Sequence, residues 1–170
     1  MSEKAMETGN EQQVPDPKKF FNEEQYNTIK IEGGKEKEKD SVSKGLLALL
    51  NSKTTGEKDI ALSLLKKENA AALLIEAINA SKSSKNKALL VAACWESGLD
   101  FKKYLDLFAN LVHHEDLFVS MEAITVISEN LTGLEEKQSE KLIAAMSKAA
   151  EDHFNADLVQ DVIERLKNKE

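Results

Sequence analysis

The sequence predicts an all-α fold in which antiparallel helix pairs stack side by side behind an acidic N-terminal tail. From residue 41 onward, apolar residues recur at the spacing of helix turns. Only 2 prolines and 7 glycines occur in 170 residues, too few for the many turns of a β fold. The length suffices for one domain with its own core, plus a modest appendage.

Residues 1–40 are expected to form a disordered acidic tail. They contain 10 acids, 7 lysines, both prolines and a charge run over residues 35–40. Such a segment buries too little apolar surface to offset the entropy lost on ordering. Residues 20–31 are richer in aromatic and aliphatic side chains. They either pack loosely on the first helices or form a linear motif that docks on a partner.

The remaining chain is expected to form one domain, residues 41–170, of seven or eight helices. The expected helices cover residues 41–52, 57–67, 69–80, 84–97, 100–113, 116–131, 135–152 and 156–168. Four residues with a side-chain oxygen that can cap a helix stand at expected starts: Asp40, Ser84, Asp100 and Asn155. Gly98 and Gly133 follow expected helix ends, where glycine readily adopts the left-handed conformation.

The expected helix pairs resemble one another at a drifting offset. Lys87 follows Asp59 by 28 residues in matching segments, and Ala123 follows Ala92 by 31. The last pair has a larger offset, because Leu142 follows Leu105 by 37. Repeats of this length predict a stacked α-solenoid, in which neighbouring pairs complete one another's core.

Residues 104–131 carry the clearest repeat: an apolar first helix, a short acidic turn at Glu115 and Asp116, and a second helix with the small residue Ala123 in its middle. This segment resembles a HEAT repeat, and the other pairs match more loosely. The resemblance implies a short right-handed α-solenoid over residues 41–168 whose second helices form a concave surface. A compact bundle of the same helices is the alternative.

No group of residues predicts chemistry, so we expect no catalytic, cofactor-binding or metal site. His113 and His114 are adjacent, and adjacent side chains on a helix diverge instead of meeting at one ion. Cys94, the sole cysteine, lies in an apolar segment and is expected to be a core thiol. Arg165 is the sole arginine, which disfavours a nucleic-acid partner because arginine is the usual ligand of phosphates and base edges.

The expected binding surface is the exposed face of the second helices, running from an apolar end to a charged end. Trp95 would anchor a partner there, or else it fills the junction between repeats. The candidate partner-binding residues are Val91, Trp95, Glu122, Thr125, Glu129, Asp161, Glu164 and Arg165.

The sequence therefore predicts a non-enzymatic protein-interaction module or adaptor that binds another protein or a peptide. The alternative is a small homo-oligomeric scaffold, although a monomer is favoured because the last helix has the polar outer face of a capping helix. No apolar run approaches the roughly 20 residues that span a bilayer, and the N-terminal residues lack an apolar core of a signal peptide. We expect a cytoplasmic protein without a membrane partner.

Overall fold

The computed structural model describes residues 36–152 and 154–168, and these form helices joined by short turns, without a strand. The predicted all-α class is confirmed for this part of the chain. Residues 1–35, which hold most of the predicted tail and the segment 20–31, lie outside it. The elements are α2 (Glu36–Asn51), α3 (Thr55–Lys67), α4 (Ala71–Ala80), α5 (Ser84–Glu96), the short 3₁₀ helix η2 (Lys102–Tyr104), α6 (Leu105–Leu111), α7 (Leu117–Glu129), α8 (Glu136–Asp152) and α9 (Ala156–Asn168).

Helix α2 already includes Glu36, the first residue that the structure describes, although its start was predicted at residue 41. The predicted start of this helix is therefore wrong, and Asp40 lies inside the helix. Glutamate and lysine alternate over residues 36–39, and both are strong helix formers. The charge run that was expected to end the tail is thus compatible with the first turns of α2.

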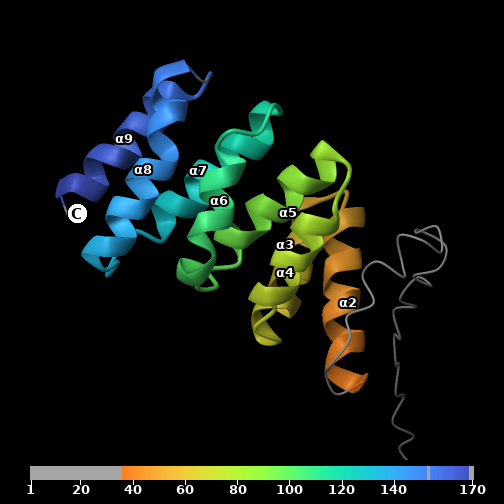
Figure 1. Cartoon of the computed structure of the whole chain (residues 1–170). Helices are drawn as coiled ribbons and strands as arrows, with labels where there is room; N and C mark the ends of the chain where they lie inside the picture. Colours follow the sequence, from red (N-terminus) through yellow and green to blue (C-terminus); the bar gives the residue numbers. More distant parts are fainter. Residues whose placement is uncertain (1–35, 153, 169–170) are drawn as a thin grey trace, which may run out of the picture.

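Helices that are close in the chain are also close in space. Each helix contacts the next in the pairs α2 with α3, α4 with α5, α6 with α7 and α8 with α9. Further contacts join α5 to α7, α7 to α9, and α6 to α8. Figure 1 shows the result: the helices follow one another across the molecule, from α2 at one end to α9 at the other. We call α2, α4, α6 and α8 the first helices, and α3, α5, α7 and α9 the second helices.

One apolar core runs through the whole row of helices. Its largest fully buried side chains come from almost every element: Leu46, Leu49, Leu65, Leu74, Ile78, Leu90, Val91, Phe101, Phe108, Val112, Ile127 and Met146. Phe101 meets Phe108 edge-on, with ring centroids 5.9 Å apart. Each such side chain contributes about 1.5–3 kcal/mol on leaving water, so the core spreads its stabilisation along the row.

Apart from the starts of α2 and of α6, which begins at Leu105 behind η2, the helix ends lie within two residues of the predicted ones. Ser83, not the predicted Ser84, caps α5, because its extended backbone lets the hydroxyl accept from the Asn86 N–H. Asp100 accepts from the N–H of Lys102 at the start of η2, 2.9 Å away. Gly98 and Gly133 have φ angles of +62° and +77°, which confirms the left-handed turns expected at both positions.

Candidate interaction surface

The large apolar side chains that remain exposed are concentrated on one set of helices. Among the described side chains they are Ile60, Leu64, Trp95, Leu117, Phe118, Met121, Phe154 and Leu158. Each lies on a second helix, except Phe154, which lies in the turn that leads into α9. Single exposed apolar residues are ordinary on protein surfaces, but here they are restricted to α3, α5, α7, α9 and the turn before α9, which distinguishes the second helices from the first helices.

Helix α7 presents the most continuous part of this surface. At 100° per residue, Phe118, Met121, Glu122, Thr125 and Glu129 fall within an arc of about 100° on one side of the helix. Phe118 is 65% exposed, the highest fraction with Ile60 among the large apolar side chains described. The face changes along its length, from apolar at Phe118 and Met121 to acidic at Glu129. We call these five residues the α7 face.

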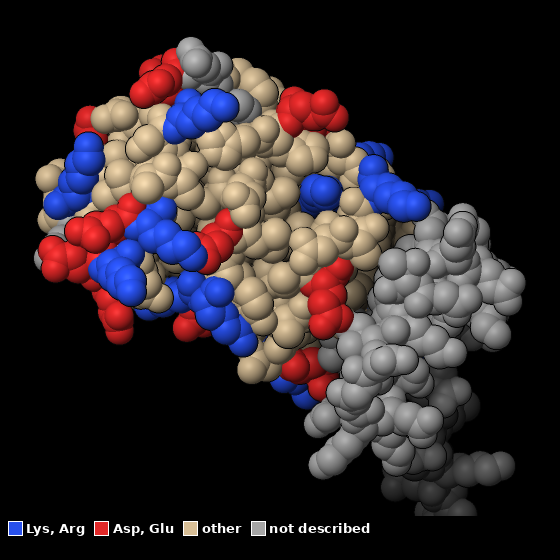
Figure 2. Space-filling view, in the orientation of Figure 1, with Lys and Arg blue, Asp and Glu red and all other residues tan. Residues whose placement is uncertain are grey.

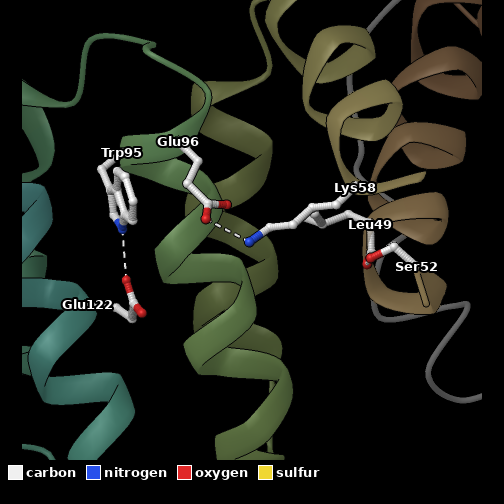
Figure 3. Close-up of polar contacts among 6 residues, drawn as sticks. All are labelled: Leu49, Ser52, Lys58, Trp95, Glu96 and Glu122. Atoms are coloured by element: carbon white, nitrogen blue, oxygen red, sulfur yellow. Dashed lines mark hydrogen bonds and ion pairs between the residues drawn. The ribbon is translucent and has the colours of Figure 1, made fainter. Parts of the chain in front are cut away.

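Polar contacts join each second helix to the next. Figure 3 shows that Trp95 and Glu96, adjacent on α5, reach in opposite directions. The Trp95 indole Nε1 donates to Glu122 Oε2 of α7 over 2.7 Å, whereas Glu96 Oε1 pairs with Lys58 Nζ of α3 over 2.6 Å. Helix α5 is thereby tied to both neighbours.

Two contacts link α7 to α9 in the same way. Arg165 donates through its guanidinium to the Ser128 hydroxyl. Asn155, directly before α9, donates through Nδ2 to the buried Ser120 hydroxyl over 2.9 Å. The Ser120 hydroxyl in turn donates to the Val112 carbonyl over 2.7 Å. Because buried polar groups are costly without partners, this chain of hydrogen bonds fixes where α9 begins relative to α7.

The structure separates the predicted partner-binding residues into four groups. Val91 is completely buried, so its prediction as a surface contact is wrong: it points from α5 into the core between helices. Trp95 is 37% exposed and also bridges to α7, so it both packs and remains accessible. Glu129, Asp161 and Glu164 are exposed.

The other three predicted residues are half-buried and take part in local contacts. Glu122 accepts from Trp95, Thr125 donates its hydroxyl to the Met121 carbonyl, and Arg165 contacts Ser128. The structure therefore brings Trp95, Glu122 and Thr125 together on α5 and α7, and Arg165 beside the end of α7.

Sequence reasoning missed Phe118 and Met121, the two most apolar members of the α7 face. The signal was present in the run Leu117, Phe118 and Val119. Three consecutive helical residues point in three directions, so they cannot all enter one core face. Only Val119 of the three is buried, which leaves Leu117 and Phe118 in solvent.

The residues considered for chemistry lie in structural surroundings. Cys94 is fully buried, as predicted, and desolvation raises the pKa of its thiol far above the ordinary value. His113 donates from Nε2 to the Ala145 carbonyl of α8 over 2.9 Å. His114 accepts at Nδ1 from the Asp116 N–H over 3.0 Å. Over residues 36–152 and 154–168, no three His, Cys, Asp or Glu side chains gather in a way that could hold a metal ion.

Charge is distributed unevenly over the molecule. In Figure 2, uncharged residues make up much of the middle of the face in view, and charged side chains of both signs gather where α8 begins and α9 ends. These two segments contain Glu136, Lys137, Glu140 and Lys141 on α8, and Arg165 and Lys167 on α9. By contrast, α7 carries two glutamates and no lysine or arginine.

Comparison of the chain with protein-family models, curated proteins and solved structures gave no significant match. The resemblance to HEAT repeats therefore stays a prediction. A search of the described helices for a segment long and apolar enough to cross a membrane found none.

Proposed function

We propose that this chain is a non-enzymatic protein-interaction module, built as a short HEAT-like solenoid that binds a protein partner on its second helices. One observation carries the proposal: the exposed large apolar side chains of the described chain lie on α3, α5 and α7, or on α9 and the turn before it. On surfaces that bind no partner, exposed apolar residues are scattered singly, whereas binding surfaces concentrate them.

The contacts between helices support a solenoid of antiparallel pairs over a compact bundle. Second helices pack on second helices in the series α5, α7 and α9, and first helices pack on each other in α6 and α8. The polar contacts between second helices also join residues about one repeat apart. Lys58 and Glu96 are separated by 38 residues, Trp95 and Glu122 by 27, Ser120 and Asn155 by 35, and Ser128 and Arg165 by 37. Separations of this size are expected when each repeat contacts the next.

The surroundings of the reactive side chains also favour binding over catalysis. A nucleophilic cysteine needs an accessible thiolate, but burial at Cys94 raises the thiol pKa and opposes ionisation. His113 and His114 each use a ring nitrogen to hold backbone groups at the α6–α7 turn and on α8. These roles are structural.

The test is capture of protein partners from a native extract by the immobilised full chain. Replacing Phe118 with alanine removes the most exposed anchor of the α7 face, and we expect about tenfold weaker retention of the dominant partner. Asn110→Ala, at an exposed site on the first helix α6, is the matched control and should retain the partner. Circular dichroism establishes that both variants keep their helicity.

Equal capture by Phe118→Ala and Asn110→Ala would contradict the proposal. The homo-oligomeric scaffold is tested on the same proteins by sedimentation velocity. A concentration-dependent dimer that Phe118→Ala dissociates would assign the second-helix surface to self-association instead.

A further inference from the structure

Resting on the proposed function, we infer that the occupant of the α7 and α9 surface is a basic amphipathic helix from another protein. Its apolar side would lie over Phe118, Met121 and Leu158, and its lysines and arginines would lie beside the acids of α7 and α9. Three features of the described residues support such an occupant: an exposed apolar strip, acids that outnumber bases around it, and a hydrogen bond that fixes the spacing of the two helices.

The apolar strip extends from α7 onto the start of α9. Phe118 and Met121 belong to the first two turns of α7, and Leu158 belongs to the first turn of α9. All three side chains are more than a third exposed. Helices α7 and α9 are in contact, and the hydrogen bond from Asn155 Nδ2 to Ser120 Oγ holds their N-terminal halves together. A partner helix can contact such a strip along its length, because apolar residues three or four positions apart lie on the same side of a helix.

Acids outnumber bases around this strip: Arg165 contacts Ser128 at the end of α7, and two stretches of the sequence contain no lysine or arginine. No lysine or arginine occurs between Lys103 and Lys137, so the whole of α7 and its flanking turns lack a positively charged side chain other than histidine. A second stretch without lysine or arginine lies between Lys148 and Arg165 and covers the first two turns of α9. Within these stretches the exposed acids of the two helices are Glu129, Asp157, Asp161 and Glu164.

Glu129, Asp157 and Asp161 are available to a partner, whereas Glu164 accepts a hydrogen bond from Gln160 one turn earlier. Within the described chain, ion pairs join Lys58 to Glu96 and Lys141 to Asp106, both away from this surface. Neither pair includes Glu129, Asp157 or Asp161. Exposed acids around an apolar centre accelerate the approach of a basic segment and disfavour an acidic one.

The same charges argue against a second copy as the occupant. A two-fold dimer on this surface would place the acids of one chain opposite the acids of the other. Like charges facing each other are unfavourable, particularly where an apolar contact excludes water. A basic helix meets no such repulsion, and this is why the structure favours it.

The experiment follows backbone amide NMR signals of the ¹⁵N-labelled full chain during titration with three synthetic peptides of equal length. The first is an amphipathic helix of leucine and lysine, the second replaces each lysine with glutamate, and the third scrambles the first so that it has no apolar side. We expect the leucine–lysine peptide alone to bind in a saturable way. Its shifts should be largest for Phe118, Met121, Glu129 and Leu158.

Charge reversal on the surface supplies the matched control. Glu129→Lys should weaken binding of the leucine–lysine peptide about threefold to tenfold, because one attraction is lost and one repulsion is added. Glu140→Lys makes the same change of net charge at an exposed site on α8 and should leave the affinity unchanged. If both variants weaken binding equally, the attraction belongs to the overall charge of the protein and the inference is wrong.

The remaining outcomes separate this inference from the proposed function. If the leucine–glutamate or scrambled peptide shifts the same amides as strongly, a basic partner is excluded, while the surface keeps its binding role. If the leucine–lysine peptide shifts only first-helix amides or none, the inference is overturned, and capture by Phe118→Ala still judges the proposed function independently. Two measurements without peptide test the other occupants. If the α7 amide signals shift when the protein is diluted, the occupant is a second copy of the chain. If these signals differ between the unmodified full chain and the full chain carrying F20S and F21S, the occupant is the segment of residues 20–31.

Discussion

Cys94 and Trp95 are adjacent on α5 and have opposite environments. Cys94 is fully buried, and its Sγ donates weakly to the Leu90 carbonyl one turn earlier, 3.4 Å away. Trp95 points outward to Glu122 of α7. Successive residues of a helix diverge by about 100°, so one position takes the core and the next takes the surface. The reactive thiol is thereby removed from solvent while the indole stays accessible.

The burial of Cys94 predicts a loss of stability at alkaline pH. In the unfolded chain the thiol ionises near pH 8.5, whereas in the folded chain desolvation raises its pKa and keeps the proton bound. Above about pH 8.5 the unfolded state therefore binds fewer protons than the folded state, and the free energy of unfolding should fall by about 1.4 kcal/mol per pH unit from this group. Below that pH this contribution is constant.

Urea unfolding of the protein and of Cys94→Ala between pH 7 and pH 10 isolates the effect of the thiol. The difference in unfolding free energy between the two proteins should be constant near pH 7 and should change steadily as the pH approaches 10. Parallel curves over the whole range would mean that Cys94 ionises as easily in the folded protein as in the unfolded chain.

At the scale of elements, the turns between helices are fixed by a few residues with special roles. Asn130 ends α7, accepts from the Phe101 N–H at Oδ1 over 3.1 Å, and donates from Nδ2 to the Val126 carbonyl over 2.8 Å. One buried side chain thus caps α7 and holds the turn before α6. Gly98, in the left-handed conformation, follows the end of α5 and leads into that turn.

Two glycines on neighbouring elements should respond to alanine in opposite directions. Gly98→Ala places a Cβ at φ +62° and should lower the free energy of unfolding by about 1–2 kcal/mol. Gly56→Ala lies in the first turn of α3, where a Cβ meets nothing within 4 Å, and should raise stability by about 0.5–1 kcal/mol. Thermal and urea unfolding measure both. A stabilising Gly98→Ala would show that this turn does not need its left-handed glycine.

At the scale of the whole molecule, the row of helices limits how far stability is shared. The principal contacts of the C-terminal pair, α8 and α9, are with each other and with α6 and α7, and those of α2 and α3 are with each other and α5. In such a row, we expect each helix pair to depend chiefly on the pairs beside it, and distant pairs to open independently. The two ends should therefore differ in their response to a local cavity.

Hydrogen exchange on the full chain with a cavity at either end tests this independence. Ile163 of α9 and Leu65 of α3 are both buried, and replacing either with alanine should cost about 2–5 kcal/mol locally. Ile163→Ala should speed amide exchange mainly in α8 and α9, and Leu65→Ala mainly in α2 and α3. Uniformly faster exchange along all helices in both variants would indicate a single cooperative core.

The local part of this architecture could be predicted from the sequence. Apolar spacing located every described helix, and the glycines at 98 and 133 marked two of the turns correctly. These features depend on residues close in the chain, because helix periodicity and left-handed turns are properties of short segments. The start of α2 was placed too late, since high charge was interpreted as disorder although Glu and Lys also favour helix.

The candidate surface depended on tertiary structure. The sequence by itself predicted an outward-facing Glu122 and left Trp95 either exposed or packed between repeats, and only the packing of α5 against α7 joined the two through a hydrogen bond. Val91 and Phe118 show most clearly that the sequence of one helix does not determine which of its apolar residues are buried. Both are apolar residues of apolar helices, yet Val91 is fully buried and Phe118 is 65% exposed. Which sides of a largely apolar helix are covered is decided by neighbours far apart in the sequence, and periodicity within one helix does not contain that information.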